Sequence, residues 1–260
     1  ASPSSGAARQ TVVEDAKTMA GLLNGSSRLI RDLKAQFNTR VEGNIAKISG
    51  LLAQVATANK TIIQATAGGG TANITMDSLD SALSELSRLI KIDTVKMTDG
   101  SVMVLTGNSR VLVQGDRVAQ LATVADTHNG YSGLGIVESA GLTVVAQVGG
   151  LFIGNPNYKA TDITGEIRGG EILGNIMARD QVLADELLEI DQMASSLIDQ
   201  VNSLHQAGYA QDGTTTNLAF FTGSKAGDIA VNASIVASSS LVAASRIAGN
   251  GVNGEQAESI

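Results

Sequence analysis

Residues 168–206 read RGGEILGNIMARDQVLADELLEIDQMASSLIDQVNSLHQ, and this stretch decides the fold. From Leu183 onward its apolar residues recur at gaps of 4, 3, 4, 3, 4 and 3. This heptad spacing puts them on one stripe of a helix that needs a partner helix to cover it. The predicted helix runs from Glu171 to Gln206 and would be on the order of 50 Å long. Its packing seam consists of Leu183, Leu187, Ile190, Ala194, Leu197, Val201 and Leu204.

The residues after this helix predict where it ends. His205 lies in the last turn, where a cation is favourable, and Gly208 suits a left-handed C-cap. Tyr209 can fold back onto the apolar stripe, and a turn follows at Asp212–Gly213. The chain is only 3% aromatic, so we favour a core position for Phe220–Phe221 over an exposed anchor for a neighbouring subunit.

Ten residues of this region form a recognisable series: Gly169, Gly170, Arg179, Asp180, Asn202, His205, Gly208, Tyr209, Phe220 and Phe221. In order and spacing they resemble the family of the first hook-associated protein of the bacterial flagellum. The resemblance covers most of residues 3–118 and 168–248 and is weak over 119–165. It implies a structural subunit at the junction between hook and filament, outside the cell, exported through the flagellum's own secretion channel.

The same resemblance implies partners. They are the hook protein, the second hook-associated protein, further copies of the chain in a ring, and an export chaperone bound through a C-terminal region. The family's terminal helices, which carry polymerisation and chaperone binding, are expected to lie outside this chain. We therefore interpret it as a central fragment and expect it to be monomeric by itself.

A second long helix is predicted in the first quarter of the chain. Asn24–Gly25 looks like a break, but the apolar stripe resumes in phase at Ile30, so one helix with a possible kink is the better interpretation. The run Gly68–Gly70 ends it. A short helix follows, with Asp77 or Ser78 as its cap.

From residue 92 the period changes to two, which is typical of strands, and Asp99–Gly100 predicts a hairpin. Strands are predicted at 92–97, 102–106, 111–113, 135–137, 142–148 and 151–153, and another at 229–235. The predicted fold is mainly α with an inserted antiparallel β subdomain (α+β), a long-helix rod or bundle. Its expected segments are 1–90 (rod helices), 91–166 (β-rich), 167–210 (returning helix) and 211–260 (loop, strand and start of a next segment).

Composition excludes several functional classes. The 18 basic and 25 acidic residues give a net charge of −7, which argues against nucleic-acid and anionic-membrane partners. There is no cysteine, which excludes disulfides and thiol chemistry. No apolar run approaches the length of about 18 residues that a membrane span needs, and no signal peptide is recognisable.

Candidate chemistry is sparse. His128 and His205 lie in different elements without a metal-ligand or catalytic partner nearby in sequence. The carboxylates of Asp185, Glu186, Glu189 and Asp191 fall between the seam positions and are expected on the outward, solvated face. The glycine runs lack the Lys-Ser/Thr of a phosphate loop. We predict no catalytic, cofactor-binding or metal-binding residue, and a protein that is not an enzyme.

Two alternatives remain open. A sibling axial protein, such as the second junction protein or a flagellin, would share the helical rods and low aromatic content. It would be expected to lack the series from Asn202 to Phe221. A glycan hydrolase acting during assembly would need a cleft with convergent titrating groups.

Overall fold

Long helices and an inserted antiparallel β region make up the fold, which confirms the predicted class. The computed structural model describes residues 5–125, 130–137, 142–144 and 160–249. The helices are α1 (Gly6–Ala67), α2 (Asn73–Leu89), α3 (Glu171–Met177), α4 (Leu183–Gln206) and α5 (Ala233–Ala237). The strands are β1 (Ile92–Lys96), β2 (Val102–Thr106), β3 (Val111–Gln114), β4 (Arg117–Ala119), β5 (Leu121–Ala125), β6 (Ser132–Val137), β7 (Leu142–Val144), β8 (Ala160–Asp162), β9 (Phe221–Thr222) and β10 (Ala230–Val231).

The chain divides into two compact units. The first unit combines Ala1–Leu33 with Leu183–Ile260, and the second unit is Lys34–Val182. The segment predicted at 91–166 lies within the second unit, where its strands share one hydrophobic core with α1, α2 and α3. It is therefore not a unit by itself. This division differs from the four predicted segments.

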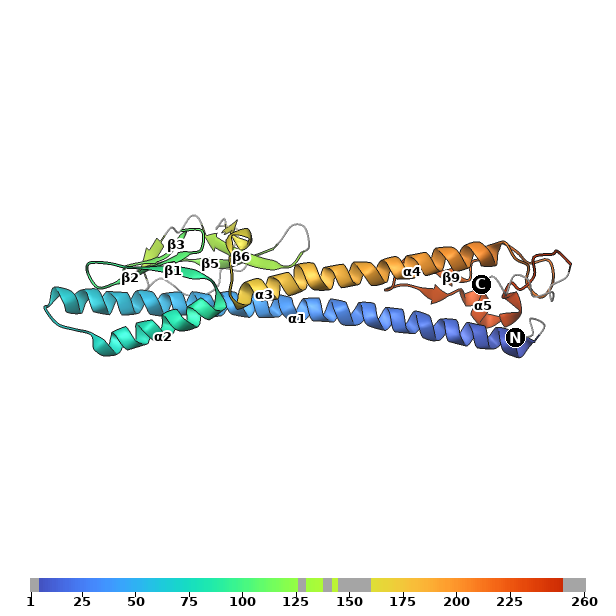
Figure 1. Ribbon diagram of the computed structural model, residues 1–260, viewed down its shortest axis with the longest axis horizontal. Helices are drawn as coiled ribbons and strands as arrows, with labels where there is room; N and C mark the ends of the chain where they lie inside the picture. Colours follow the sequence, from blue (N-terminus) through green and yellow to red (C-terminus); the bar gives the residue numbers. More distant parts are fainter. Residues whose placement is uncertain (1–4, 126–129, 138–141, 145–159, 250–260) are drawn as a thin grey trace. The chain divides into compact units, whose positions relative to one another are not determined.

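Helix α1 is continuous over its 62 residues, as the in-phase stripe predicted (Figure 1). The Asn24 side chain donates to the carbonyl of Ala20 (2.7 Å) and to that of Ile229 (2.8 Å), so this polar residue is used for packing within the first unit. The helix ends where Gly69 takes a φ of +74° and the N–H of Gly70 donates to the carbonyl of Ala65. Four glycines inside α1 have open space where a Cβ would stand: Gly21, Gly25, Gly43 and Gly50.

The core of the second unit lies between α1, α2, α3 and two antiparallel sheets. The five-stranded sheet has the order β1-β2-β3-β4-β7, and the three-stranded sheet has the order β5-β6-β8. Figure 1 shows these strands and α2 on opposite sides of the C-terminal half of α1. Fully buried side chains from each of these elements meet in this core, among them Ile45, Leu52, Leu86, Leu112, Leu134 and Ile172.

The predicted hairpin at Asp99–Gly100 joins β1 to β2, with Gly100 at a φ of +82°. The strands predicted at 102–106, 111–113 and 135–137 and the first part of 142–148 are present. Strands β4, β5 and β8 were not predicted, because each is short or lies in a stretch without clear alternation. The predicted strand at 151–153 and residues 145–148 lie outside the described residues.

Helix α2 begins one turn earlier than predicted, so neither Asp77 nor Ser78 is its cap. The cap position is Ala72, whose carbonyl already accepts from the N–H of Met76 (2.9 Å). Ser78 lies inside the helix, and its hydroxyl donates to the carbonyl of Ile74 (3.0 Å). A hydroxyl can satisfy its own helix in this way as well as cap it, so the capping pattern was ambiguous.

In the first unit, the N-terminal half of α1 and helix α4 enclose the two-stranded sheet of β9 and β10 together with α5. The strand predicted at 229–235 is wrong after Val231. The side chain of Asn232 accepts from the N–H of Ser234 (3.0 Å) and caps α5. An Asx cap overrides the weak alternation of this small-residue stretch.

The helix predicted from Glu171 to Gln206 is present over its whole length, but its first third contains an irregularity that was not predicted. A π turn at Ala178–Val182 separates α3 from α4. Such a turn holds one residue more than an α turn, and it occurs frequently where a side chain has a specific role. Here Arg179 lies in it, buried to 1% exposure.

Candidate functional site

The pair Gly169–Gly170 brings the chain against the end of α2. Gly170 has a φ of +88°, and a Cβ there would lie 2.5 Å from the carbonyl oxygen of Leu89 and 2.7 Å from the Cα of Ile90. The carbonyl of Gly169 accepts from the N–H of Lys91 (3.1 Å). Gly170 is thus required for a close backbone crossing, whereas a Cβ at Gly169 would make only ordinary contact with Lys91 at 3.5 Å.

Arg179 is the centre of a buried polar cluster in the second unit. Its guanidinium donates from Nε and Nη2 to the two carboxylate oxygens of Asp180, both at 2.7 Å. Its Nη1 donates to Asn38 Oδ1 (2.7 Å) on α1 and to the carbonyl of Ser132 (2.8 Å) on β6. The guanidinium carbon also lies 5.0 Å from the ring centre of Tyr131. The planar guanidinium can make several directional hydrogen bonds at once, whereas the ammonium group of a lysine could not reproduce this geometry.

The acceptors of Arg179 are themselves fixed. Asn38 Oδ1 also accepts from the N–H of Ser132 (2.7 Å), and Asn38 Nδ2 donates to Glu42 (2.9 Å). The hydroxyl of Ser132 donates to the same carboxylate (2.6 Å). These three residues and Arg179 tie α1, β6 and the π turn together, so the predicted motif pair Arg179–Asp180 has a positioning geometry.

Asn202 performs a similar task in the first unit. Its Oδ1 accepts from the N–H of Phe221 (2.8 Å), and its Nδ2 donates to the Phe221 carbonyl (2.9 Å). Asn232 reaches the preceding residues, with Nδ2 donating to the Ala219 carbonyl and its N–H to the Phe220 carbonyl. Phe220 and Phe221 are buried edge to face at 4.9 Å between ring centres, which places the pair in the core.

His205 is buried to 1% exposure and bridges two segments of backbone. Its Nε2 accepts from the N–H of Ala243 (2.9 Å), so the ring proton is on Nδ1, which donates to the carbonyl of Leu218 (2.7 Å). Burial lowers the pKa of the imidazole, and the bond to Leu218 opposes this only in part. The prediction of a cation at the helix end is therefore wrong, because the buried ring is held neutral.

The turn after α4 differs from the predicted cap. Gly213 has a positive φ but Gly208, among the described glycines, does not, so the left-handed cap at Gly208 is wrong. The N–H of Gly208 donates to the carbonyl of His205 (3.2 Å) in a tight turn. An unpredicted main-chain pairing follows, in which the N–H of Tyr209 donates to the carbonyl of Ser245 (2.8 Å).

The predicted turn at Asp212–Gly213 is present. The Asp212 carboxylate accepts from the N–H groups of Thr214 (2.9 Å) and Thr215 (2.8 Å) and from the Thr215 hydroxyl (2.6 Å). These bonds, that of the Thr215 hydroxyl foremost, lower the pKa of Asp212 well below its usual range.

The buried face of α4 coincides with the predicted seam at Ala194 and moves off it farther along the helix. Ala194 is fully buried, and the other six seam residues are half-buried. Ile198 and His205 are buried although they are not seam positions. A straight α-helix drifts from a strict seven-residue repeat by about 20° per heptad, which moves the buried face one residue later.

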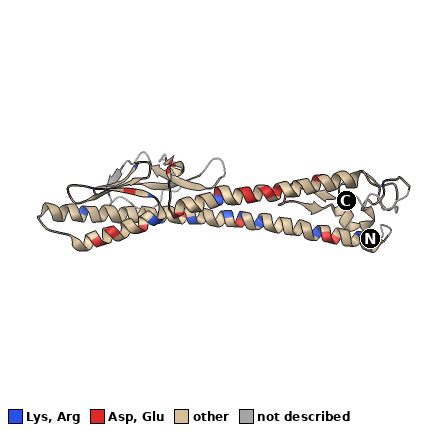
Figure 2. Cartoon of the chain, in the orientation of Figure 1, with Lys and Arg blue, Asp and Glu red and all other residues tan. Residues whose placement is uncertain are grey.

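Figure 2 marks the acidic residues of α4 in red, and it shows residues of both signs along α1. Asp185, Glu186 and Glu189 are exposed, as predicted. Asp191 is not on the outward face, because its carboxylate accepts from the N–H of Ala226 (3.0 Å). His128, the other predicted structural histidine, lies outside the described residues.

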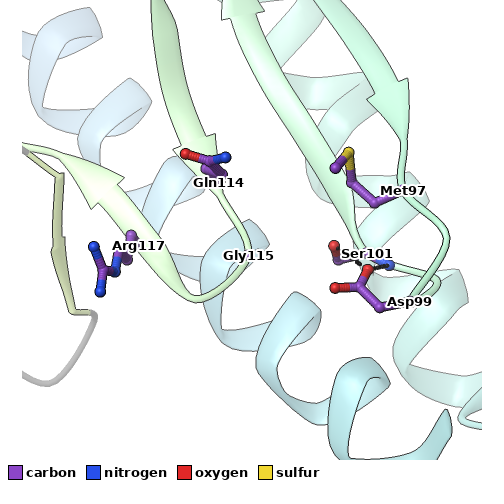
Figure 3. Close-up of a pocket in the computed structure, with 6 residues that line it drawn as sticks. All are labelled: Met97, Asp99, Ser101, Gln114, Gly115 and Arg117. Carbon is purple, nitrogen blue, oxygen red and sulfur yellow. Dashed lines mark hydrogen bonds between the residues drawn. The ribbon is translucent and has the colours of Figure 1, made fainter.

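The second unit has a polar cleft of about 340 Å³ at the turns β1–β2 and β3–β4, shown in Figure 3. Met97 and Asp99 lie on one side of it, on the β1–β2 hairpin, and Gln114 and Arg117 lie on the other, on the β3–β4 hairpin. The Asp99 carboxylate accepts from the N–H and hydroxyl of Ser101, which lowers its pKa and keeps it charged. A fixed, ionised carboxylate does not make a general acid at neutral pH.

The first unit has an apolar groove of about 260 Å³. It is lined by Val12, Asp15, Ala16 and Met19 of α1, by Leu197 and Val201 of α4, and by the Phe220–Phe221 pair, so Asp15 is the one charged residue among these described residues. Across the described ranges, no group of three or more His, Asp or Glu side chains could hold a metal ion. Within the same ranges, no helix is long and apolar enough to span a membrane.

Comparison with known proteins shows which family this chain resembles. Two curated relatives, both named flagellar hook-associated protein 1 and found in Salmonella typhimurium and Salmonella typhi, are 28% identical over 222 residues. The alignment covers 84% of this chain, which spans only 37% of the length of each relative. The solved structure of the flagellar hook junction protein FlgK from Burkholderia pseudomallei has the same fold, with a TM-score of 0.72 and 24% identity over 84% of this chain and 37% of that one.

The family model described as the flagellar hook-associated protein FlgK helical domain matches residues 1–221. This range includes both glycines at the α2 crossing, the Arg179 cluster, Asn202 and the phenylalanine pair. Since the match covers more than half of the chain, the protein belongs to the flagellar hook-associated protein FlgK helical-domain family.

Proposed function

We propose that this chain is the helical part of a structural adaptor subunit that joins the bacterial flagellar hook to the filament. The observation that carries the proposal is the family match over residues 1–221. The name of the Burkholderia relative, a hook junction protein, supports the same role. The proposed role is structural and requires no catalysis.

The mechanism we propose is mechanical. Long helices carry buried polar side chains that bond across to strands and loops, as Arg179 does in the second unit and Asn202 in the first. Such bonds are directional, so each unit resists local rearrangement under load. Polar outward faces would meet neighbouring subunits, and many modest contacts repeated around a ring make a stiff but adaptable joint.

The proposed partners follow from this role. They are the hook protein on one side, the second hook-associated protein on the other, and further copies of the same chain in the ring. An export chaperone would bind a C-terminal region of the whole protein. The proposed location is extracellular, reached through the flagellar secretion channel.

The test is electron microscopy of cells that lack the full gene. We expect hooks without filaments and flagellin shed into the medium, with filaments restored by the wild-type gene. Filaments of normal number and length in the deletion strain would contradict the role and favour a sibling axial protein.

A matched pair of variants ties this phenotype to the fold described here. The full gene carrying Gly170→Val should fail to restore filaments, because the new side chain would overlap the backbone at Leu89 and Ile90. Gly174→Ala, four residues along in open space, should restore them fully. Equal restoration by both variants would mean that the crossing at Gly170 does not matter to the joint.

A further inference from the structure

Among the described residues of α4, His205 is the one buried titratable side chain. It also holds the chain segment that follows the helix in place. Its two ring nitrogens take two backbone partners from different segments, the carbonyl of Leu218 and the N–H of Ala243. The ring edge also lies against Phe220, at 5.3 Å between ring centres. One imidazole thus joins α4, the loop after it and the C-terminal segment.

The bond from Ala243 depends on the protonation state of the ring. Nε2 can accept only while it carries no proton, and a protonated imidazole presents N–H groups at both nitrogens. Protonation would place two donors face to face at 2.9 Å, leaving the Ala243 N–H without an acceptor in a buried site.

Among the described residues, neither ring nitrogen is bonded to an acidic side chain that could balance a positive charge. Both partners of the ring are backbone groups, and the adjacent carbonyl of Val242 accepts from the guanidinium of Arg9 on α1. The carboxylate of Asp212 is already bonded to Thr214 and Thr215. The ionisable groups on the segments that these bonds join include Arg9 on α1, Asp199 on α4, Tyr209 and Asp212 in the loop after α4, and Arg246 in the C-terminal segment.

We propose that His205 is a proton-sensitive latch: a proton from solvent on Nε2 releases the backbone at Ala243 from α4 and loosens the C-terminal segment. Burial, which disfavours the charged ring, sets the release on the acid side of neutrality. If the chain acts outside the cell, as proposed above, the latch would respond to the acidity of the medium. The dependence of the Ala243–His205 hydrogen bond on protonation holds whether or not the chain has that role.

The test is a pH titration of the whole chain by NMR. The imidazole signal of His205 is assigned with His128→Gln, because these are the only two histidines. We expect the exchange protection of the Ala243 amide to fall at least about tenfold between about pH 7.5 and about pH 5, with the same midpoint as the ring. Protection that stays constant while the ring titrates would overturn the latch, as would a ring that does not titrate in this range.

The matched variant is His205→Gln, which keeps a neutral acceptor and donor but cannot titrate. Ala243 protection in this variant should not depend on pH beyond the intrinsic exchange rate. A loss of protection on acidification equal to that of the wild type would place the switch elsewhere. If the variant does not fold, the wild-type titration decides by itself, since it compares the ring with the amide in one sample.

Discussion

Some positions in this fold accept only one residue type, and Gly170 is the clearest example. Substitution by alanine forces a positive φ on a residue with a Cβ and drives that Cβ into the backbone of Leu89 and Ile90. Together the backbone strain and overpacking should lower the free energy of unfolding by about 3 kcal/mol. Urea unfolding measures this.

The control for that substitution is Gly174→Ala inside α3, the helix that Gly170 precedes as its N-cap residue. It has space for the methyl group and should raise stability by up to about 1 kcal/mol, since alanine favours a helix over glycine. Equal effects of the two substitutions would show that the crossing at Gly170 is looser than described.

Asn59 is a second residue of this kind, fully buried on α1. Its side chain accepts from the N–H of Val102 (2.8 Å) and donates to the carbonyls of Val102 (2.8 Å) and Gly115 (2.9 Å). Asn59→Ala would leave these groups buried without partners and should destabilise the second unit by about 3 kcal/mol. Thr57→Ala, exposed on the same helix, should change stability by less than about 0.5 kcal/mol in the same thermal melts.

The carboxylate of Asp212 makes stability depend on pH at the acid end. Its folded pKa is lowered, so its stabilising contribution is full above the unfolded pKa of about 3.9 and is lost as the pH falls toward the folded value. Asp212→Asn should therefore be less stable than the wild type at neutral pH and lose less stability on acidification below about pH 4. Urea midpoints across this range would show parallel curves if the turn contributed nothing.

At the scale of elements, the shifted seam of α4 gives a direct test. Ile198, 5% exposed, lies outside the predicted stripe but in the core. Ile198→Ala should cost about 2–4 kcal/mol, whereas Leu188→Ala, at 56% exposure, should cost less than about 0.5 kcal/mol. Comparable losses would mean that the apolar face of α4 is covered on a side where the described residues leave it open.

Elements with a strong period were predictable, and the connections between them were not. The stripe of α1 stayed in phase across Asn24–Gly25, and the alternation around Asp99–Gly100 fixed a hairpin by local chemistry alone. The π turn at Arg179 depends on acceptors 141 and 47 residues away in sequence, which no local pattern reveals.

The site residues show the same limit. The core position predicted for Phe220–Phe221 is confirmed. The charge state of His205 could not be predicted, because a helix C-terminus favours the charged imidazole whereas burial favours the neutral one. Only the positions of Leu218 and Ala243 decide that burial wins. Asn59 gave no signal, because a lone polar residue on an apolar stripe is equally compatible with exposure.

At the scale of the whole molecule, the two units have separate hydrophobic cores, so unfolding should not be a single cooperative step. Ile198→Ala should raise hydrogen exchange at Phe221 by at least about tenfold and leave Val113 nearly unchanged. Leu86→Ala should do the reverse. Equal changes at both amides in both variants would show one cooperative unit coupled through α1.

The glycines of α1 also affect the order in which parts of the chain can fold. Four glycines inside this helix, with nothing packed where a methyl group would stand, each weaken the helix by about 1 kcal/mol relative to alanine. A helix of this kind is marginal in water by itself and needs the segments that cover it, which come more than a hundred residues later in the first unit. During synthesis, the part of α1 that lies in the first unit is therefore expected to gain a stable helical structure only after the residues from Leu183 onward have been made and pack on it.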